Sequence, residues 1–245
     1  VRSYVVKKKS TNGVIEESLV EAESSSLQGV IHESAKNISK VTSRSSKIYN
    51  NVIKGLSRHD LSELKKNKKQ ISKLSEEVDS LKDKLFYFIK NLDESSLGAS
   101  NFYINLLGYL QDITQSIEYV SKVSHKHINN NHSKLTLNQI RDLLAIQEVM
   151  SGLFETISST FKNKSFKEIE VILKDKSNSI GLIEDKIETQ ISRTRSSEEK
   201  SPKNTALYFS ILQESKDLMK EIMSLIEDYY VSYDKSVKPA KPKDE

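Results

Sequence analysis

The sequence predicts an all-α fold built from two copies of one three-helix unit. Helix breakers are rare, with only 7 Gly and 3 Pro among 245 residues. Apolar residues recur at three- and four-residue spacings along most of the chain, as on amphipathic helices. Apolar stripes, acidic positions and loops also coincide when the chain is shifted against itself by about 105 residues. We therefore expect six long antiparallel helices, three in each unit, packed into one elongated body.

The clearest helix is expected from Asp60 to Asn91. Asp60 suits the N-cap, with Glu63 three residues later as its capping-box partner. An unbroken helix of this length is about 45 Å long. The apolar side chains follow an a/d pattern that places them on one stripe: Leu61, Leu64, Ile71, Leu74, Val78, Leu81, Leu85 and Phe88.

The same spacing marks five further helices. The Asn129–Asn131 triplet between the third and fourth helices suits a tight turn, because Asn tolerates left-handed backbone angles. Short connections of this kind make neighbouring helices antiparallel. The five apolar stripes run from Leu27 to Ile48, from Tyr103 to Val120, from Leu137 to Phe154, from Ile169 to Ile191 and from Tyr208 to Tyr229.

The internal repeat divides the chain into four parts. At the offset of about 105 residues, Tyr103 falls on Tyr208 and Asp112 falls on Asp217 without a gap. The two three-helix repeats are expected at 26–130 and 131–235. Residues 1–25 would form an N-terminal arm or juxtamembrane tether, and the Lys- and Pro-rich residues 236–245 a disordered tail.

The composition is that of a scaffold more than of an enzyme. Charged residues make up 29% of the chain, and 38 basic and 34 acidic residues are mixed along it, giving a net charge of +4. Dense basic clusters occur only at Lys7–Lys9 and at Lys65, Lys66, Lys68 and Lys69; we interpret both as solvated surface and expect no nucleic-acid partner. With no Cys, no nucleophile motif and no phosphate-binding glycine loop, we expect no enzymatic activity. No apolar run reaches the roughly 20 residues that a membrane span needs.

The candidate metal ligands are two acidic pairs at matched positions of the repeat. Asp79 and Asp83, like Glu184 and Glu188, are spaced i, i+4 and project from one side of a helix. Oxygen ligands of this kind suit hard cations, and a bound cation would relieve the repulsion within each pair. Asp112 and Asp217 also match across the repeat and are weaker candidates. Because all four paired acids lie opposite the apolar stripe, the alternative is a solvated helix face, with Lys82 and Lys186 as surface partners.

A duplicated three-helix bundle with an acidic i, i+4 pair in each half resembles PhoU, the bacterial regulator of phosphate uptake. A closer resemblance lies between Ser100 and His132, which include Tyr103-Ile-Asn-Leu-Leu-Gly-Tyr-Leu110 and the Asn-Asn-His turn. This stretch is similar to the PhoU-like soluble tail of PiT-type inorganic phosphate transporters. The resemblance implies a metal-binding Glu/Asp-x-x-x-Asp motif for iron, zinc or another divalent metal. Asp79-x-x-x-Asp83 fits this motif, whereas Glu184-x-x-x-Glu188 ends in Glu instead of Asp.

The resemblance also implies the function and the partners. The chain would be a cytoplasmic regulatory domain of such a transporter, at the inner face of the membrane, contacting a membrane domain that belongs to the same polypeptide. Basic residues within 1–9 would then lie near anionic lipid headgroups. Two alternatives stay open, namely a stand-alone PhoU-type signalling adaptor and a structural helical bundle without metal. The sequence also leaves open whether the chain forms a homo-oligomer.

Overall fold

The structure, a computed structural model, describes residues 26–90 and 97–233, which form only helices and their connecting turns. The predicted all-α class is confirmed for these residues. The predicted arm at 1–25 and the predicted tail at 236–245 lie outside the described residues. In chain order the α-helices are α1 (Leu27–Arg58), α2 (Leu61–Ser80), α3 (Leu85–Lys90), α4 (Leu97–Asn129), α5 (Leu137–Lys162), α6 (Ile169–Lys174), α7 (Lys176–Arg195) and α8 (Pro202–Ser232), with short 3-10 helices at Leu81–Lys84 and Phe166–Glu168.

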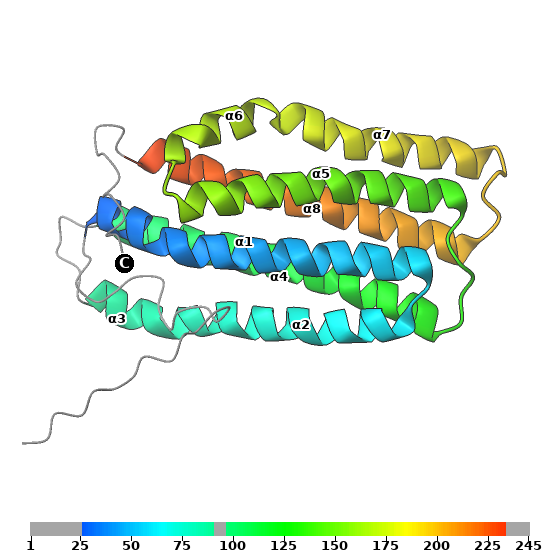
Figure 1. Cartoon of the computed structure of the whole chain (residues 1–245), viewed down its shortest axis with the longest axis horizontal. Helices are drawn as coiled ribbons and strands as arrows, with labels where there is room; N and C mark the ends of the chain where they lie inside the picture. The colour runs from blue at the N-terminus through cyan, green and yellow to red at the C-terminus, as the bar shows by residue number, and fades with distance from the viewer. Residues whose placement is uncertain (1–25, 91–96, 234–245) are drawn as a thin grey trace, which may run out of the picture.

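Four long helices form the centre of the molecule. Helices α1 and α5 lie side by side and antiparallel, and α4 and α8 pair in the same way behind them (Figure 1). The α2–α3 segment runs along one edge of this group, against α1 and α4, and the α6–α7 segment runs along the opposite edge, against α5 and α8. Buried side chains from all of these helices except α3 form one continuous hydrophobic core. The helices therefore build a single elongated body.

Local sequence signals set most helix ends. The Asp60 side chain caps α2 by accepting a hydrogen bond from the backbone N–H of Glu63 at 2.9 Å, as predicted. The Glu63 side chain accepts from Asn67 instead of closing the capping box. A complete capping box, which the sequence analysis did not identify, joins Thr136 and Gln139 at the start of α5. In the turn before it Asn131 has a φ of 56°, which is the left-handed conformation expected of the Asn triplet.

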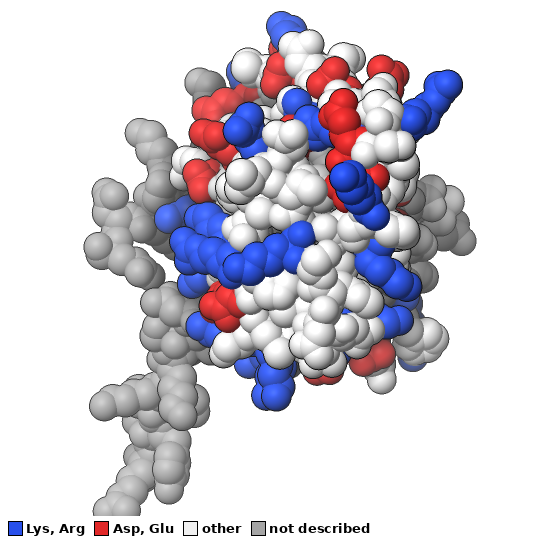
Figure 2. Space-filling model, turned by 90° about the vertical axis from the view of Figure 1, so that its right-hand side faces the viewer, with Lys and Arg blue, Asp and Glu red and all other residues white. Residues whose placement is uncertain are grey.

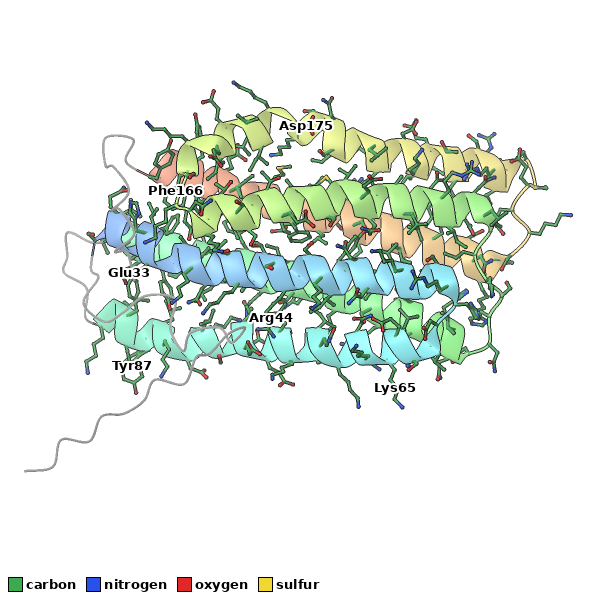
Figure 3. The ribbon with its side chains drawn as sticks, viewed as in Figure 1. Glu33, Arg44, Lys65, Tyr87, Phe166 and Asp175 are labelled. Atoms are coloured by element: carbon green, nitrogen blue, oxygen red, sulfur yellow. The ribbon has the colours of Figure 1, made fainter. Side chains whose placement is uncertain are left out.

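The prediction of six uninterrupted helices is wrong, because the second and fifth are broken. The helix expected from Asp60 to Asn91 changes to a 3-10 helix at Leu81–Lys84, just after the Ser80 hydroxyl donates to the Glu77 carbonyl. The fifth bends at Asp175, which ends α6 and precedes α7 (Figure 3). The backbone N–H of Asp175 donates to the Ile172 carbonyl at 3.2 Å, which is a 3-10-type hydrogen bond that ends α6. The Asp175 carboxylate accepts hydrogen bonds from the side chains of Asn178 and Ser179 in the first turn of α7.

Two buried pairs of hydroxyl groups link α1 to α8 by hydrogen bonds inside the core. The Tyr49 hydroxyl and the Ser215 hydroxyl are 2.8 Å apart, and Ser34 and Tyr229 form a second buried pair of the same kind. Burial raises the pKa of Tyr49 to about 12 and also raises the pKa of Tyr229. Since a buried hydroxyl needs a partner, these pairs fix the register of α1 against α8.

Candidate functional site

The first predicted acidic pair lies on the exposed surface of the α2 edge. Asp79 is near the end of α2, and its Oδ1 accepts a hydrogen bond from Gln111 Nε2 of α4 at 2.6 Å. Asp83 lies beyond the break, in the 3-10 helix. A 3-10 helix has three residues per turn, whereas an α-helix has 3.6. The i, i+4 spacing therefore does not place these two carboxylates on one face as an unbroken α-helix would.

The second predicted pair lies on the opposite edge of the molecule. Glu184 and Glu188 are both exposed within the uninterrupted α7, and Glu184 Oε1 is 3.8 Å from Lys216 Nζ of α8. Because α2 and α7 flank the body on opposite edges, the fold does not bring the two pairs together (Figure 1). Among residues 26–90 and 97–233, no three His, Asp or Glu side chains are grouped closely enough to hold a metal ion. The metal assignment stays a prediction for elemental analysis.

The fold does bring Asp112 and Asp217 together, on facing sides of α4 and α8. They line one hollow of about 520 Å³ with Glu214 and Glu221. Burial raises the pKa of Glu221, and the negative charges of Asp112 and Asp217 raise it further. Burial also raises the pKa of Glu214, against a hydrogen bond from Ser116 that lowers it. The hollow can take up a proton or accept a cationic group, because either reduces the repulsion among its carboxylates.

A polar network that the sequence analysis missed lies inside the second half of the chain. Asp142 of α5 is 7% exposed, and its Oδ2 accepts from Arg193 of α7 at 2.9 Å and from the Tyr208 hydroxyl of α8 at 3.0 Å. Lys186 of α7 approaches the other carboxylate oxygen at 3.6 Å. Burial and the Asp142 charge raise the pKa of Tyr208. This network ties three helices together, and it surrounds the nearly buried Asp142 carboxylate with two partly exposed cations.

A cluster of exposed apolar side chains occupies the α3 end of the molecule. Phe86 and Tyr87 are 65% and 63% exposed, and their rings meet edge to face at 5.4 Å. Ile89 is also exposed, and Lys90 lies 6.0 Å from the centre of the Phe86 ring. On its inner side α3 is held by Phe88, which stacks on Tyr103 of α4 at 4.3 Å. We call the exposed Phe86, Tyr87 and Ile89 the α3 patch.

Comparison with known proteins does not assign a class to this fold and these surfaces. No protein-family model, curated protein or solved structure matches the chain. No helix of the described ranges combines the length and the apolar character needed to cross a membrane.

Proposed function

We propose that this chain is a PhoU-like regulatory domain of an inorganic phosphate transporter, which acts by docking on the membrane domain. The helix arrangement supports a duplicated three-helix unit, since α1, α2 and α4 pack together, as do α5, α7 and α8. Helices in equivalent places of the two units, α1 with α5 and α4 with α8, then pair across the centre.

Matched positions of the repeat occupy corresponding surroundings, which also supports this duplication. Tyr103 and Tyr208 are both fully buried, near the starts of α4 and α8. Phe88 contacts Tyr103, and Arg193, at the matching position of the second unit, belongs to the network around Tyr208. One unit thus fills this place with an aromatic stack and the other with charged groups.

The α3 patch is the observation that carries the docking proposal. A fully exposed large apolar side chain forgoes roughly 1.5–3 kcal/mol of burial, so adjacent exposed aromatics favour a surface that a partner covers. Lys82 and Lys84 precede the patch in the sequence, and Lys90 follows it and lies over the Phe86 ring. Tyr87 projects away from the bundle (Figure 3). Apolar rings beside Lys side chains suit the cytoplasmic boundary of a membrane domain, where aromatic groups and positive charge are both favoured.

The two ends of the described helical body lie at this same end of the molecule. The start of α1 and the end of α8 are joined by a hydrogen bond from Gln28 Nε2 to the Ser232 carbonyl at 2.9 Å. The opposite end, which holds the α1–α2, α4–α5 and α7–α8 connections, shows Lys, Arg, Asp and Glu side chains spread around uncharged surface (Figure 2). The α3 end is therefore the one that we assign to the membrane domain.

The proposal can be tested by co-expressing the chain with the membrane domain of an inorganic phosphate transporter. A photo-crosslinking amino acid at Tyr87 should capture that membrane domain. The same group at Leu137, which is 80% exposed at the opposite end, should not. The chain should change the rate of radiolabelled phosphate uptake, and a Phe86→Ser/Tyr87→Ser variant should abolish that change while a Leu137→Ser variant retains it.

Three results would contradict the proposal. Uptake that does not respond to the chain excludes a regulatory role on the transporter. Crosslinks from Tyr87 to a water-soluble partner alone favour the stand-alone PhoU-type adaptor. Crosslinks to no protein, with uptake unchanged, favour the structural bundle. Because the substituted side chains are exposed, circular dichroism melting curves of the variants should match those of the parent.

A further inference from the structure

A hollow between α2 and α4 collects more positive than negative charge. It is an open surface hollow of about 600 Å³, lined by four lysines of α2 and one histidine of α4. Counted from Lys65, the other three lysines follow after three, four and eight residues, which places them along one side of the helix. The lining consists of Lys65, Lys68, Lys69, Ser72, Lys73, Glu76 and His125. We call it the lysine hollow.

The lysine side chains of this hollow have no ion-pair partner among the described residues. None of the four comes within 4.0 Å of a carboxylate oxygen, although Arg44, Lys122 and Lys186 each do. Two neighbouring acids on these helices are engaged elsewhere, since Glu77 pairs with Arg44 and Glu118 pairs with Lys122. Glu76 is the one acid in the lining. Like charges held together without partners repel one another, and a bound anion would remove that repulsion.

The positive charge of the lysines also affects the pKa of His125, which lines the hollow from α4. Burial lowers the pKa of its imidazole, and the positive charges of Lys68 and Lys65 lower it further. The two lysines therefore act on one point of the hollow from across the helix interface. A neutral imidazole can still donate one hydrogen bond to an anion.

We propose that the lysine hollow binds a short chain of phosphoryl groups, such as the triphosphate of a nucleotide or an inorganic oligophosphate. Lys65 and Lys73 are separated by about 12 Å along the helix axis, at 1.5 Å per residue. That span exceeds a single phosphate and matches a few linked phosphoryl groups. Four ammonium groups and the one Glu76 carboxylate give the lining a net charge of +3, which attracts a triphosphate, and a neutral His125 adds one hydrogen-bond donor. The Ser72 hydroxyl donates to Glu118 of α4 at 3.4 Å. Lys65 lies on the outer side of α2, open to an incoming ligand (Figure 3).

The same geometry disfavours a nucleic acid as the occupant. A nucleic acid contacts a long basic stripe through many phosphates. Here the lysines occupy one short stretch of a single helix, and Glu76 closes one end of it. This inference goes beyond the proposed function, because it depends on the lysine hollow alone and not on the α3 patch.

Titration calorimetry of the purified chain at low salt tests the proposal, with inorganic triphosphate, ATP, orthophosphate and sulfate as separate probes. Triphosphate and ATP should bind at a one-to-one ratio, and more tightly than orthophosphate or sulfate. A Lys68→Gln/Lys69→Gln variant should weaken binding by at least about tenfold, since lost charge-assisted hydrogen bonds contribute on the order of 1.4 kcal/mol or more. Lys66→Gln is the matched control, because Lys66 is an exposed lysine of the same helix outside the hollow.

The probes also distinguish the source of the phosphoryl groups. Equal affinity for ATP and triphosphate means that the chain reads only the phosphates, tighter ATP binding indicates a nucleotide, and tighter triphosphate binding indicates an inorganic oligophosphate. In a second readout, triphosphate should raise the pKa of His125 in an NMR titration, because the anion offsets Lys65 and Lys68. The other basic groups near His125 are Lys69 and Lys73 in the lining of the hollow and Lys122 and Lys126 on its own helix.

Four outcomes would overturn the proposal. Sulfate that binds as tightly as triphosphate would show only diffuse charge attraction. A Lys66→Gln variant that weakens binding as much as the double variant would show the same. Binding to anionic phospholipid vesicles without binding of any soluble phosphate would assign the surface to a membrane instead. Absence of binding by all four probes to the folded chain would leave the lysines as solvated surface.

Discussion

The buried carboxylate of Asp142 should be among the most sensitive positions in the second half of the chain. Asp142→Asn keeps the shape of the side chain but removes its charge, so that Arg193 and Lys186 lose their common partner. The Tyr208 hydroxyl retains an amide oxygen to which it can donate. The loss is therefore mainly that of an enclosed ion pair whose Arg193 side chain stays partly accessible to water.

The magnitude lies between two limits. Breaking a fully buried ion pair destabilises a protein by roughly 3–5 kcal/mol, whereas a surface pair contributes about 0–1 kcal/mol. Asp142 is nearly buried and its cations are partly exposed, so we expect the free energy of unfolding to fall by about 3 kcal/mol. For a chain of this size that corresponds to a Tm lower by roughly 6–12 °C.

Chemical denaturation followed by far-UV circular dichroism measures this change. Glu227→Gln is the matched control, because Glu227 pairs with Lys176 at 3.4 Å while its side chain is 54% exposed; its loss should change the unfolding free energy by less than about 0.5 kcal/mol. Arg193→Met should restore part of the stability of Asp142→Asn, since it removes the unpaired cation. If Asp142→Asn unfolds within about 0.5 kcal/mol of the parent, the network does not hold α5, α7 and α8 together.

Three further predictions concern alkaline stability, helix capping and metal content. Tyr49 has a folded-state pKa of about 12 against its ordinary 10.0, so its contribution is complete below pH 10 and is lost as pH rises toward 12; Tyr49→Phe should make alkaline unfolding curves less steep by one proton, and an unchanged slope would show that the phenol titrates normally. Asp60→Ala should lower the unfolding free energy by about 1 kcal/mol in urea denaturation, because α2 loses its N-cap, and Ser62→Ala, one residue into the helix, should have little effect. Elemental analysis of the purified chain tests the predicted metal sites: stoichiometric iron, zinc or another divalent metal that is lost in Asp79→Ala/Asp83→Ala and Glu184→Ala/Glu188→Ala variants would support them, and metal retained in both variants would contradict them.

The candidate sites were only partly predictable. Asp112 and Asp217 could be named because they recur at one offset, but Glu214 and Glu221 became part of the same hollow only when α4 and α8 were paired. On α8 the three acids are spaced three and four residues apart, which is a stripe that the sequence already contains. Nothing in that spacing says which helix lies opposite, so the change in the pKa of Glu221 could not be anticipated.

The sequence by itself determined which segments are helical and several helix ends, but not the breaks at Leu81–Lys84 and at Asp175. Apolar spacing, the Asp60 cap and the Asn131 turn act over a few residues, and such short-range preferences are readable in one dimension. The tertiary structure alone decided the Asp142 network, the lysine hollow and the burial of hydroxyls between α1 and α8. Each of these depends on side chains from helices that are distant in the chain. Their partners are fixed by how the apolar faces of the helices pack together, and a local pattern does not specify that packing.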